Sequence, residues 1–122
     1  MTLKILIVDD EFCLAEILAD ILAERGYETI IAINGKHGLE RLLEHHADLV
    51  LLDVMMPIMD GPTMLRRMRA EGALADIPVV MMTAVRETLP KDDPPLHQAA
   101  LIKPFHPDAM LTLVARLTMP PR

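Results

Sequence analysis

Acidic side chains stand directly behind two apolar runs of the sequence. The triplet Asp9, Asp10 and Glu11 follows the first run, and a fourth acidic residue, Asp53, closes the third. Carboxylates gathered at one place repel one another and raise each other's pKa unless a cation lies among them. Mg²⁺ suits such a group, because it takes oxygen ligands, keeps several waters and typically uses one or two protein carboxylates together with a phosphate. If the two run ends meet in the fold, these residues predict a magnesium site.

Two further polar residues occupy equivalent positions along the chain. Thr83 closes the fourth apolar run, and Lys103 follows the fifth. The lysine adds a compact positive charge, and the threonine adds a hydroxyl donor. With a carboxylate nucleophile and a metal ion, these are the groups needed to accept a phosphoryl group, a reaction in which catalysis is mainly positioning and charge neutralisation. Alone, Thr83 would be a polar strand end and Lys103 a surface lysine, so the prediction depends on their meeting Asp53.

The elements that must position these residues can be seen in the alternation of two patterns. Short apolar runs cover residues 3–8, 28–33, 49–53, 78–83 and 99–102, and segments of helical periodicity lie between the early runs and again from about residue 107. This alternation predicts a doubly wound α/β sheet of parallel strands joined by right-handed crossovers, with flanking helices. Ligands of such sheets bind beyond the carboxyl ends of the strands. If the first and third strands are neighbours, as in the flavodoxin-like strand order 2-1-3-4-5, their carboxylates converge. In the third periodic segment, Arg66, Arg67 and Arg69 are expected on a solvated face.

One segment breaks the alternation. A helix is expected between Thr83 and Ala99, but this segment contains Pro90, Pro94 and Pro95. Each proline lacks the backbone donor that a helix interior needs, and a proline also biases the residue before it away from the helical region. We therefore expect the fourth helix of the series to be short, distorted or missing, with a mobile loop in its place.

The composition narrows the classes of function. The 122 residues fit one domain, for which we expect residues 1–119 as the folded unit and 120–122 as a frayed tail. Twelve basic residues against 18 acidic ones give a formal net charge of −6, which argues against a basic surface for nucleic acid. The single cysteine, Cys13, excludes an internal disulfide and favours a reducing cytoplasm. No apolar run is long enough to cross a membrane.

Four motifs at the run ends together resemble a known family. They read Ile7-Val8-Asp9-Asp10-Glu11, Leu51-Leu52-Asp53-Val54-Met55-Met56-Pro57-Ile58-Met59-Asp60-Gly61, Met82-Thr83-Ala84 and Ile102-Lys103-Pro104-Phe105. Each motif alone is modest, but four of them in order at the correct strand ends form a specific signal. The chain resembles a response-regulator receiver domain of bacterial two-component signalling, and the resemblance covers essentially its whole length.

The resemblance implies a phosphoacceptor site. Asp53 would receive a phosphoryl group from the phosphohistidine of a sensor histidine kinase or a histidine phosphotransfer protein. Asp9, Asp10 and Asp53 would hold Mg²⁺ together with the backbone carbonyl of Met55. The further residues that the resemblance assigns to this site, as contacts of the phosphoryl group, are Thr83 and Lys103.

Some positions depart from the family pattern. The resemblance implies a cis bond between Lys103 and Pro104. It also implies a tyrosine or phenylalanine three residues before the lysine, whose rotation transmits the signal. This chain has Ala100 there, and residues 96–98 read Leu-His-Gln in place of the usual Gly-Ala-Asp. The signal is then relayed by ordering of the loop 85–98, or phosphate is received and passed on without a large switch.

These implications define the expected function. We expect a stand-alone receiver in a two-component phosphorelay that signals to a separate protein, as a monomer or weak dimer, without binding nucleic acid directly and without being an enzyme. Phosphatases of the haloacid-dehalogenase type also use a strand-end aspartate with Mg²⁺, but they carry a second aspartate two residues on, where this chain has Met55. The alternative is a degenerate receiver that binds a partner without phosphorylation, which Ala100 and the prolines keep open.

Overall fold

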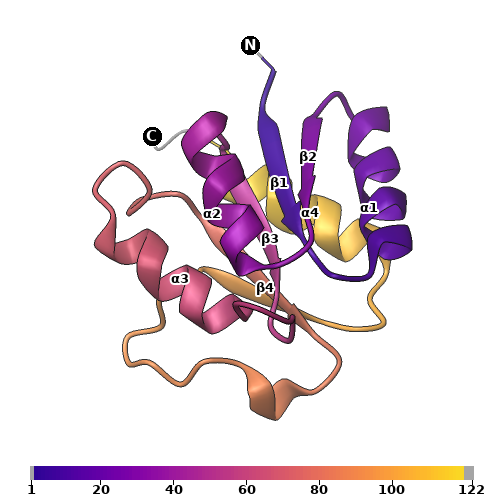
Figure 1. Ribbon diagram of the computed structural model, residues 1–122. Helices are drawn as coiled ribbons and strands as arrows, with labels where there is room; N and C mark the ends of the chain where they lie inside the picture. Colours follow the sequence, from indigo (N-terminus) through magenta and orange to yellow (C-terminus); the bar gives the residue numbers. More distant parts are fainter. Residues whose placement is uncertain (1, 120–122) are drawn as a thin grey trace.

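Parallel strands form the centre of the molecule. The computed structural model describes residues 2–119 and contains a five-stranded parallel sheet in the order β2-β1-β3-β4-β5 (Figure 1). The strands are β1 (Lys4–Val8), β2 (Glu28–Ala32), β3 (Leu49–Asp53), β4 (Val79–Thr83) and β5 (Ala99–Ile102). The predicted fold class and strand order are confirmed, and the strands begin and end within one residue of the predicted runs. The tail expected at 120–122 lies outside the described residues.

Four α-helices cover the two faces of the sheet. They are α1 (Phe12–Glu24), α2 (Gly35–Glu44), α3 (Gly61–Ala70) and α4 (Pro107–Leu117). One core cluster lies under α2 and α3 and the other under α1 and α4 (Figure 1). Successive strand residues alternate between the clusters, so that Leu51 and Met82 face α1 and α4 while Leu52 and Met81 face α2 and α3. Because both faces are covered, β3 and β4 are buried at every residue and read as continuous apolar runs.

The segment between β4 and β5 carries no α-helix. It contains one 3-10 helix, η1 (Arg86–Thr88), and otherwise runs as the orange loop at the lower edge of Figure 1. The prediction of a short, distorted or missing fourth helix is thus confirmed. Leu89 and Leu96 from this segment pack against the core cluster under α2 and α3, so apolar contacts still cover this part of the sheet; the mobility of the loop stays a prediction.

Hydrogen bonds from Arg69 connect the end of this segment to α3. Its guanidinium donates four hydrogen bonds: 3.0 Å to the Leu96 carbonyl, 3.1 Å to the Ala75 carbonyl, 2.8 Å to the Ile77 carbonyl and 3.0 Å to Oε1 of Gln98. The expectation that Arg69 lies on a solvated face is therefore wrong, because the loop folds back over it; its neighbours Arg66 and Arg67 are exposed as expected. Desolvation by burial lowers the pKa of the Arg69 guanidinium.

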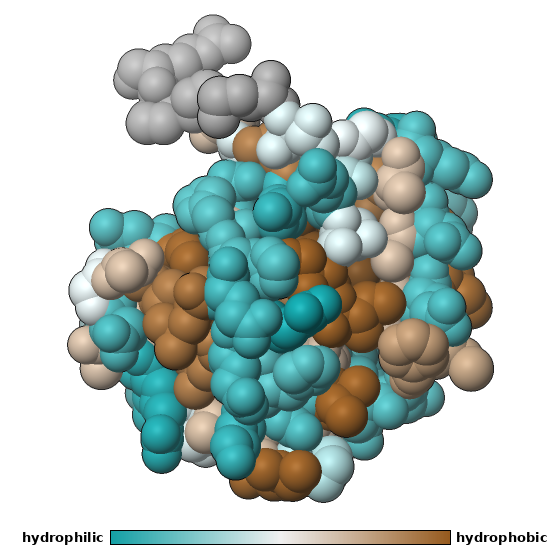
Figure 2. Space-filling view, turned by 45° about the horizontal axis from the view of Figure 1, so that its top comes forward, coloured by the Kyte–Doolittle hydropathy of each residue, from teal (hydrophilic) through white to brown (hydrophobic). Residues whose placement is uncertain are grey.

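The surface is mixed in polarity. Figure 2 shows a band of hydrophilic residues through the middle of one face, with hydrophobic residues on either side. Phe12, Met55 and Ile58 are among the exposed large hydrophobic residues, and each lies close in sequence to an acidic residue at the end of β1 or β3. Within residues 2–119, no helix is long and apolar enough to span a membrane.

Candidate functional site

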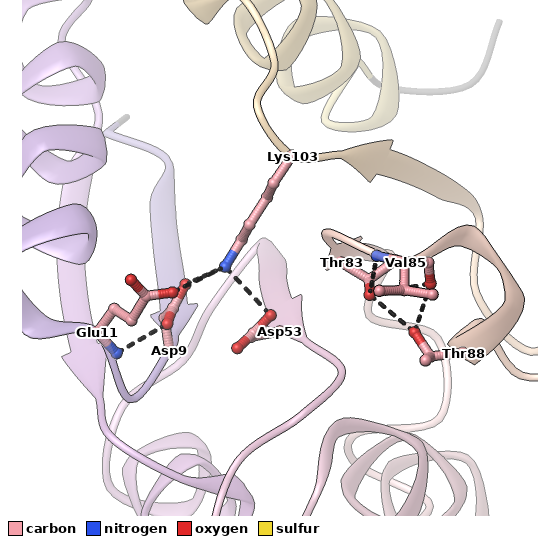
Figure 3. A network of polar contacts seen from close by, with 7 residues as sticks. All are labelled: Asp9, Glu11, Asp53, Thr83, Val85, Thr88 and Lys103. Carbon is pink, nitrogen blue, oxygen red and sulfur yellow. Dashed lines mark hydrogen bonds and ion pairs between the residues drawn. The ribbon is translucent and has the colours of Figure 1, made fainter.

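The carboxyl ends of β1 and β3 bring three carboxylates together. These strands are parallel neighbours with Val8 paired to Leu52, so Asp9 and Asp53, the residues that follow, come to the same edge of the sheet. One carboxylate oxygen from each of Asp9, Asp10 and Asp53 lies within 4.8 Å of the others. Figure 3 shows Asp9 and Asp53 below the tip of the Lys103 side chain. The convergence expected from the strand ends is therefore present in the structure.

Lys103 is the cation of this cluster. Its Nζ lies 3.0 Å from Oδ2 of Asp9, 3.2 Å from Oδ1 of Asp53 and 3.8 Å from Oε1 of Glu11 (Figure 3). The Lys103 amide donates a 2.8 Å hydrogen bond to the Thr83 carbonyl, which ties the end of β5 to the end of β4. The bond between Lys103 and Pro104 is cis, as the resemblance implied. The lysine therefore reaches from the edge strand to the carboxylates at the centre of the sheet.

Burial sets the protonation of the site. Asp9 is fully buried and Asp53 is 7% exposed. Burial raises the pKa of Asp53 from 3.8 to about 6; the charge of Asp9 acts in the same direction, whereas Lys103 opposes it. Burial acts to lower the pKa of Lys103, but its hydrogen bonds and charge interactions with Asp9 and Asp53 outweigh that effect and raise it. With a pKa of about 6, Asp53 is still mainly ionised at neutral pH, beside a charged Lys103.

The donor set of the cluster fits a hydrated divalent cation. Hard carboxylate oxygens are the ligands that Mg²⁺ takes, and the ion requires room for several waters. Asp9 is buried whereas Asp10 is exposed, so the carboxylates lie between the protein interior and solvent. A cleft of about 370 Å³ opens over them, with Asp10, Asp53 and Met55 in its wall. Met55 is therefore placed beside the carboxylates, and the role expected for its backbone carbonyl stays a prediction.

The loop after β3 holds Asp53 through a close backbone approach. The Gly61 amide donates a 2.9 Å hydrogen bond to the Val54 carbonyl, and a Cβ at residue 61 would collide with the carbonyl oxygen of Asp53. Asp60 does not join the cluster but caps α3, accepting a 2.9 Å hydrogen bond from the Thr63 amide. The sequence motif contained Gly61, but the need for a glycine is visible only in this approach.

Thr83 lines the same cleft as Asp53 and Lys103, yet its hydroxyl faces the loop that follows β4 (Figure 3). The Thr83 Oγ1 lies 2.7 Å from the Oγ1 of Thr88 and 3.2 Å from the Val85 carbonyl oxygen, and it accepts a 3.1 Å hydrogen bond from the Val85 amide. Sequence reasoning missed Thr88. The only available signal was a second hydroxyl residue in the segment predicted to lack a regular helix.

Comparisons with known proteins agree with this geometry. The family model described as the response regulator receiver domain matches residues 5–115, and the chain belongs to this family. The transcriptional regulatory protein DltR of Streptococcus agalactiae is 36% identical over 115 residues, which cover 92% of this chain and 50% of that protein. The DNA-binding response regulator MtrA of Mycobacterium leprae is 37% identical over an alignment of 126 residues, which covers 96% of this chain and 52% of that protein.

Solved structures share the fold along almost the whole chain. A putative response regulator from Chloroflexus aurantiacus matches with a TM-score of 0.89 and 28% identity, over 97% of this chain and 98% of the other. The Vibrio cholerae chemotaxis protein CheY4 matches with a TM-score of 0.87 and 26% identity, over 96% of this chain and 99% of the other. The chain therefore has the flavodoxin-like fold of CheY-like receivers, which are signalling modules of two-component systems.

The curated relatives extend beyond the matched region. The chain spans about half the length of DltR and of MtrA. MtrA is named a DNA-binding regulator, so the expectations that this receiver stands alone and acts without nucleic acid gain no support from its relatives.

Proposed function

We propose that Asp53 accepts a phosphoryl group from the phosphohistidine of a sensor histidine kinase or a histidine phosphotransfer protein. The observation that carries this proposal is the position of the Asp53 carboxylate between Asp9 and Lys103 at the carboxyl edge of a receiver fold. A carboxylate beside a cation in an open acidic cleft is a nucleophile that a phosphorus atom can approach. With a pKa of about 6, Asp53 is mainly ionised at neutral pH.

In the proposed transfer, an oxygen of Asp53 bonds to phosphorus as the phosphorus–nitrogen bond to the donor histidine breaks. The electron pair of the broken bond stays on the imidazole nitrogen, which takes a proton from water, and Asp53 becomes an acyl phosphate. Lys103 Nζ contacts Oδ1 of Asp53, which leaves Oδ2 for the attack. Asp9 holds Lys103 in this position, where its ammonium can also neutralise charge on the arriving phosphoryl oxygens.

The same residues supply the cation site that the transfer requires. Asp9, Asp10 and Asp53 would hold Mg²⁺ with their carboxylates, and Met55 would add its backbone carbonyl. When bound, Mg²⁺ offsets the negative charge that the carboxylates and the phosphoryl group bring together. The excess of carboxylate over lysine in the described cluster supports this proposal.

The partners follow from the reaction. A histidine kinase or phosphotransfer protein must bring its phosphohistidine to the acidic edge. Two exposed apolar side chains are available there: Met55, which lines the cleft, and Phe12, which follows Glu11 in the sequence. Signalling to a separate downstream protein in the cytoplasm stays a prediction. The greater length of DltR and MtrA makes an attached output region the other possibility to be tested.

The test uses phosphoramidate, a small donor with a phosphorus–nitrogen bond, and intact mass. The wild-type protein with Mg²⁺ is expected to gain one phosphoryl group that is lost on standing, and chelation of the metal is expected to prevent the gain. Asp53→Asn should remain unmodified. Asp76→Asn is the matched control, because Asp76 is exposed just before β4, at the opposite end of that strand from the cleft.

Two results would contradict the proposal. A folded wild-type protein that gains no phosphoryl group would favour the alternative, a receiver that binds its partner without phosphorylation. An adduct of unchanged yield in Asp53→Asn would place the acceptor on another residue.

A further inference from the structure

The hydroxyl of Thr83 makes its hydrogen bonds with the loop after β4 and not with groups in the cleft. A threonine hydroxyl has one proton to donate. If Thr88 donates its proton to the Val85 carbonyl, 2.6 Å away, then Thr83 can donate to Thr88 or to the same carbonyl. If Thr88 instead donates to Thr83, the Val85 carbonyl is the acceptor that the structure offers to Thr83. In each arrangement the Thr83 proton points to the loop, away from Asp53.

Thr88 can bond to the Thr83 hydroxyl because it is the last residue of η1. The 3-10 turn is closed by hydrogen bonds from the Thr88 amide to the Val85 carbonyl, 3.0 Å, and from the Leu89 amide to the Arg86 carbonyl, 3.1 Å. That turn carries the Thr88 side chain back to the end of β4, where Thr83 is 3% exposed (Figure 3). A buried polar group requires partners, and Thr88 is the nearest of those that the loop supplies to the Thr83 hydroxyl.

We propose that Thr88 is a positioning residue for Thr83: it holds the Thr83 hydroxyl away from Asp53 until a phosphoryl group competes for it. This inference rests on the proposed function, in which Thr83 contacts the phosphoryl group. To donate to that group, Thr83 must give up the hydrogen bond that it donates within the loop, to Thr88 or to the Val85 carbonyl. This exchange of partners removes a hydrogen bond between the end of β4 and the loop that contains η1. It would offer a route for the signal in a chain that has Ala100 in place of the aromatic switch residue.

The exchange predicts the direction of the coupling. Because the loop already carries these bonds before phosphorylation, the expected change is a release of η1 and not the ordering of the loop 85–98 that the sequence suggested. Coupling between two equilibria is reciprocal, so release of η1 favours the phosphorylated form as much as phosphorylation favours release of η1. Removal of the Thr88 hydroxyl weakens the hold on Thr83 and is expected to act in the same direction. One hydrogen bond between neutral groups corresponds to a change in affinity of about threefold to tenfold.

The test measures binding of beryllium fluoride with Mg²⁺, an analogue of the phosphoryl group, by titration calorimetry. Thr88→Val, which replaces the hydroxyl by a methyl group of similar size, is expected to bind the analogue about threefold to tenfold more tightly than the wild type. Thr88→Ser, which keeps the hydroxyl, is expected to bind like the wild type. Thr118→Val is the matched control, because the Thr118 hydroxyl donates to the Val114 carbonyl in α4, outside the site.

Amide hydrogen exchange gives a second, local readout. In the wild type, the analogue is expected to speed exchange of the Thr88 and Leu89 amides, which close η1. In Thr88→Val these amides should already exchange fast, and the analogue should change them little.

The outcomes separate this inference from the proposed function. If the wild type binds no analogue, the proposed function fails and this inference fails with it. If the wild type binds but Thr88→Val binds with equal or weaker affinity, or if Thr88→Ser behaves like Thr88→Val, only the role of Thr88 is overturned. Thr88→Ala repeats the measurement with a smaller side chain, and the same increase in affinity is expected from it.

Discussion

Asp53→Asn is expected to stabilise the metal-free protein. The ionised Asp53 is unfavourable in the folded state, because burial and the neighbouring Asp9 raise its pKa from 3.8 to about 6. A shift of about two pKa units corresponds to about 3 kcal/mol, and solvent and salt in an open cleft reduce this to about 2 kcal/mol. Asparagine keeps the shape and an oxygen for Lys103 without the charge. In a domain of this length the change corresponds to a rise in melting temperature of about 8 °C.

The pH dependence has a definite sign. The pKa of Asp53 is higher in the folded state than in the unfolded chain, so its protonated form favours folding at low pH, and this contribution is lost as the pH rises through about 6. Asparagine does not titrate. The difference in unfolding free energy between Asp53→Asn and the wild type should therefore be near zero below the unfolded pKa and should grow until the pH is above about 6.

The assay is urea unfolding in the presence of a chelator, at several values from about pH 4 to about pH 8. Asp76→Asn is the control for loss of one exposed carboxylate. Added Mg²⁺ should stabilise the wild type more than Asp53→Asn and so narrow the gap between them. Two results would contradict an unfavourable buried charge on Asp53: an Asp53→Asn variant no more stable than the wild type at neutral pH, or a stability difference that does not change with pH.

Three further predictions concern the segments that support the site, and each is measured by urea unfolding. Gly61→Ala should lower the unfolding free energy by about 2 kcal/mol or more, because its Cβ meets the carbonyl oxygen of Asp53; an unchanged midpoint would mean that the loop can shift freely. Ile58→Gly should raise it by about 1 kcal/mol, because Ile58 is a β-branched residue held at a φ of 71°, and a loss of stability would show that the Ile58 side chain makes compensating contacts. Arg69→Met should cost about 3 kcal/mol, since it leaves three partly buried carbonyl oxygens without this donor. Arg66→Met, which breaks an exposed pair, should cost less than about 0.5 kcal/mol, and equal losses would contradict this assignment.

The strand ends were predictable because two rules act together. Parallel strands bring their carboxyl ends to one edge, and short apolar runs reveal where each strand ends. The sequence alone therefore predicts that Asp9, Asp53 and Lys103 lie together. Prolines likewise predicted the loss of the fourth helix, because their missing donors are a property of the residue itself.

The missed contacts depend on the path of a loop. In the sequence, Arg69 falls on the expected solvated face of an amphipathic helix. In the structure, carbonyls of residues 75 and 77 and the return of residues 96–98 over α3 partly cover it. Thr88 reaches Thr83 because a single 3-10 turn happens to close between them. No periodicity encodes such a turn, so the direction of the Thr83 hydroxyl could not be read from the residue types alone.

The most direct test of the central claim is to locate the phosphoryl group on the chain. After phosphorylation with phosphoramidate and Mg²⁺, borohydride reduces an aspartyl phosphate to homoserine, and peptide mass spectrometry identifies the changed position. We expect homoserine at residue 53 alone. Chelation of the metal before the phosphorylation step should abolish its formation. Homoserine at Asp9 or Asp10, a phosphoryl group on a histidine, or no modification of the folded protein would contradict it.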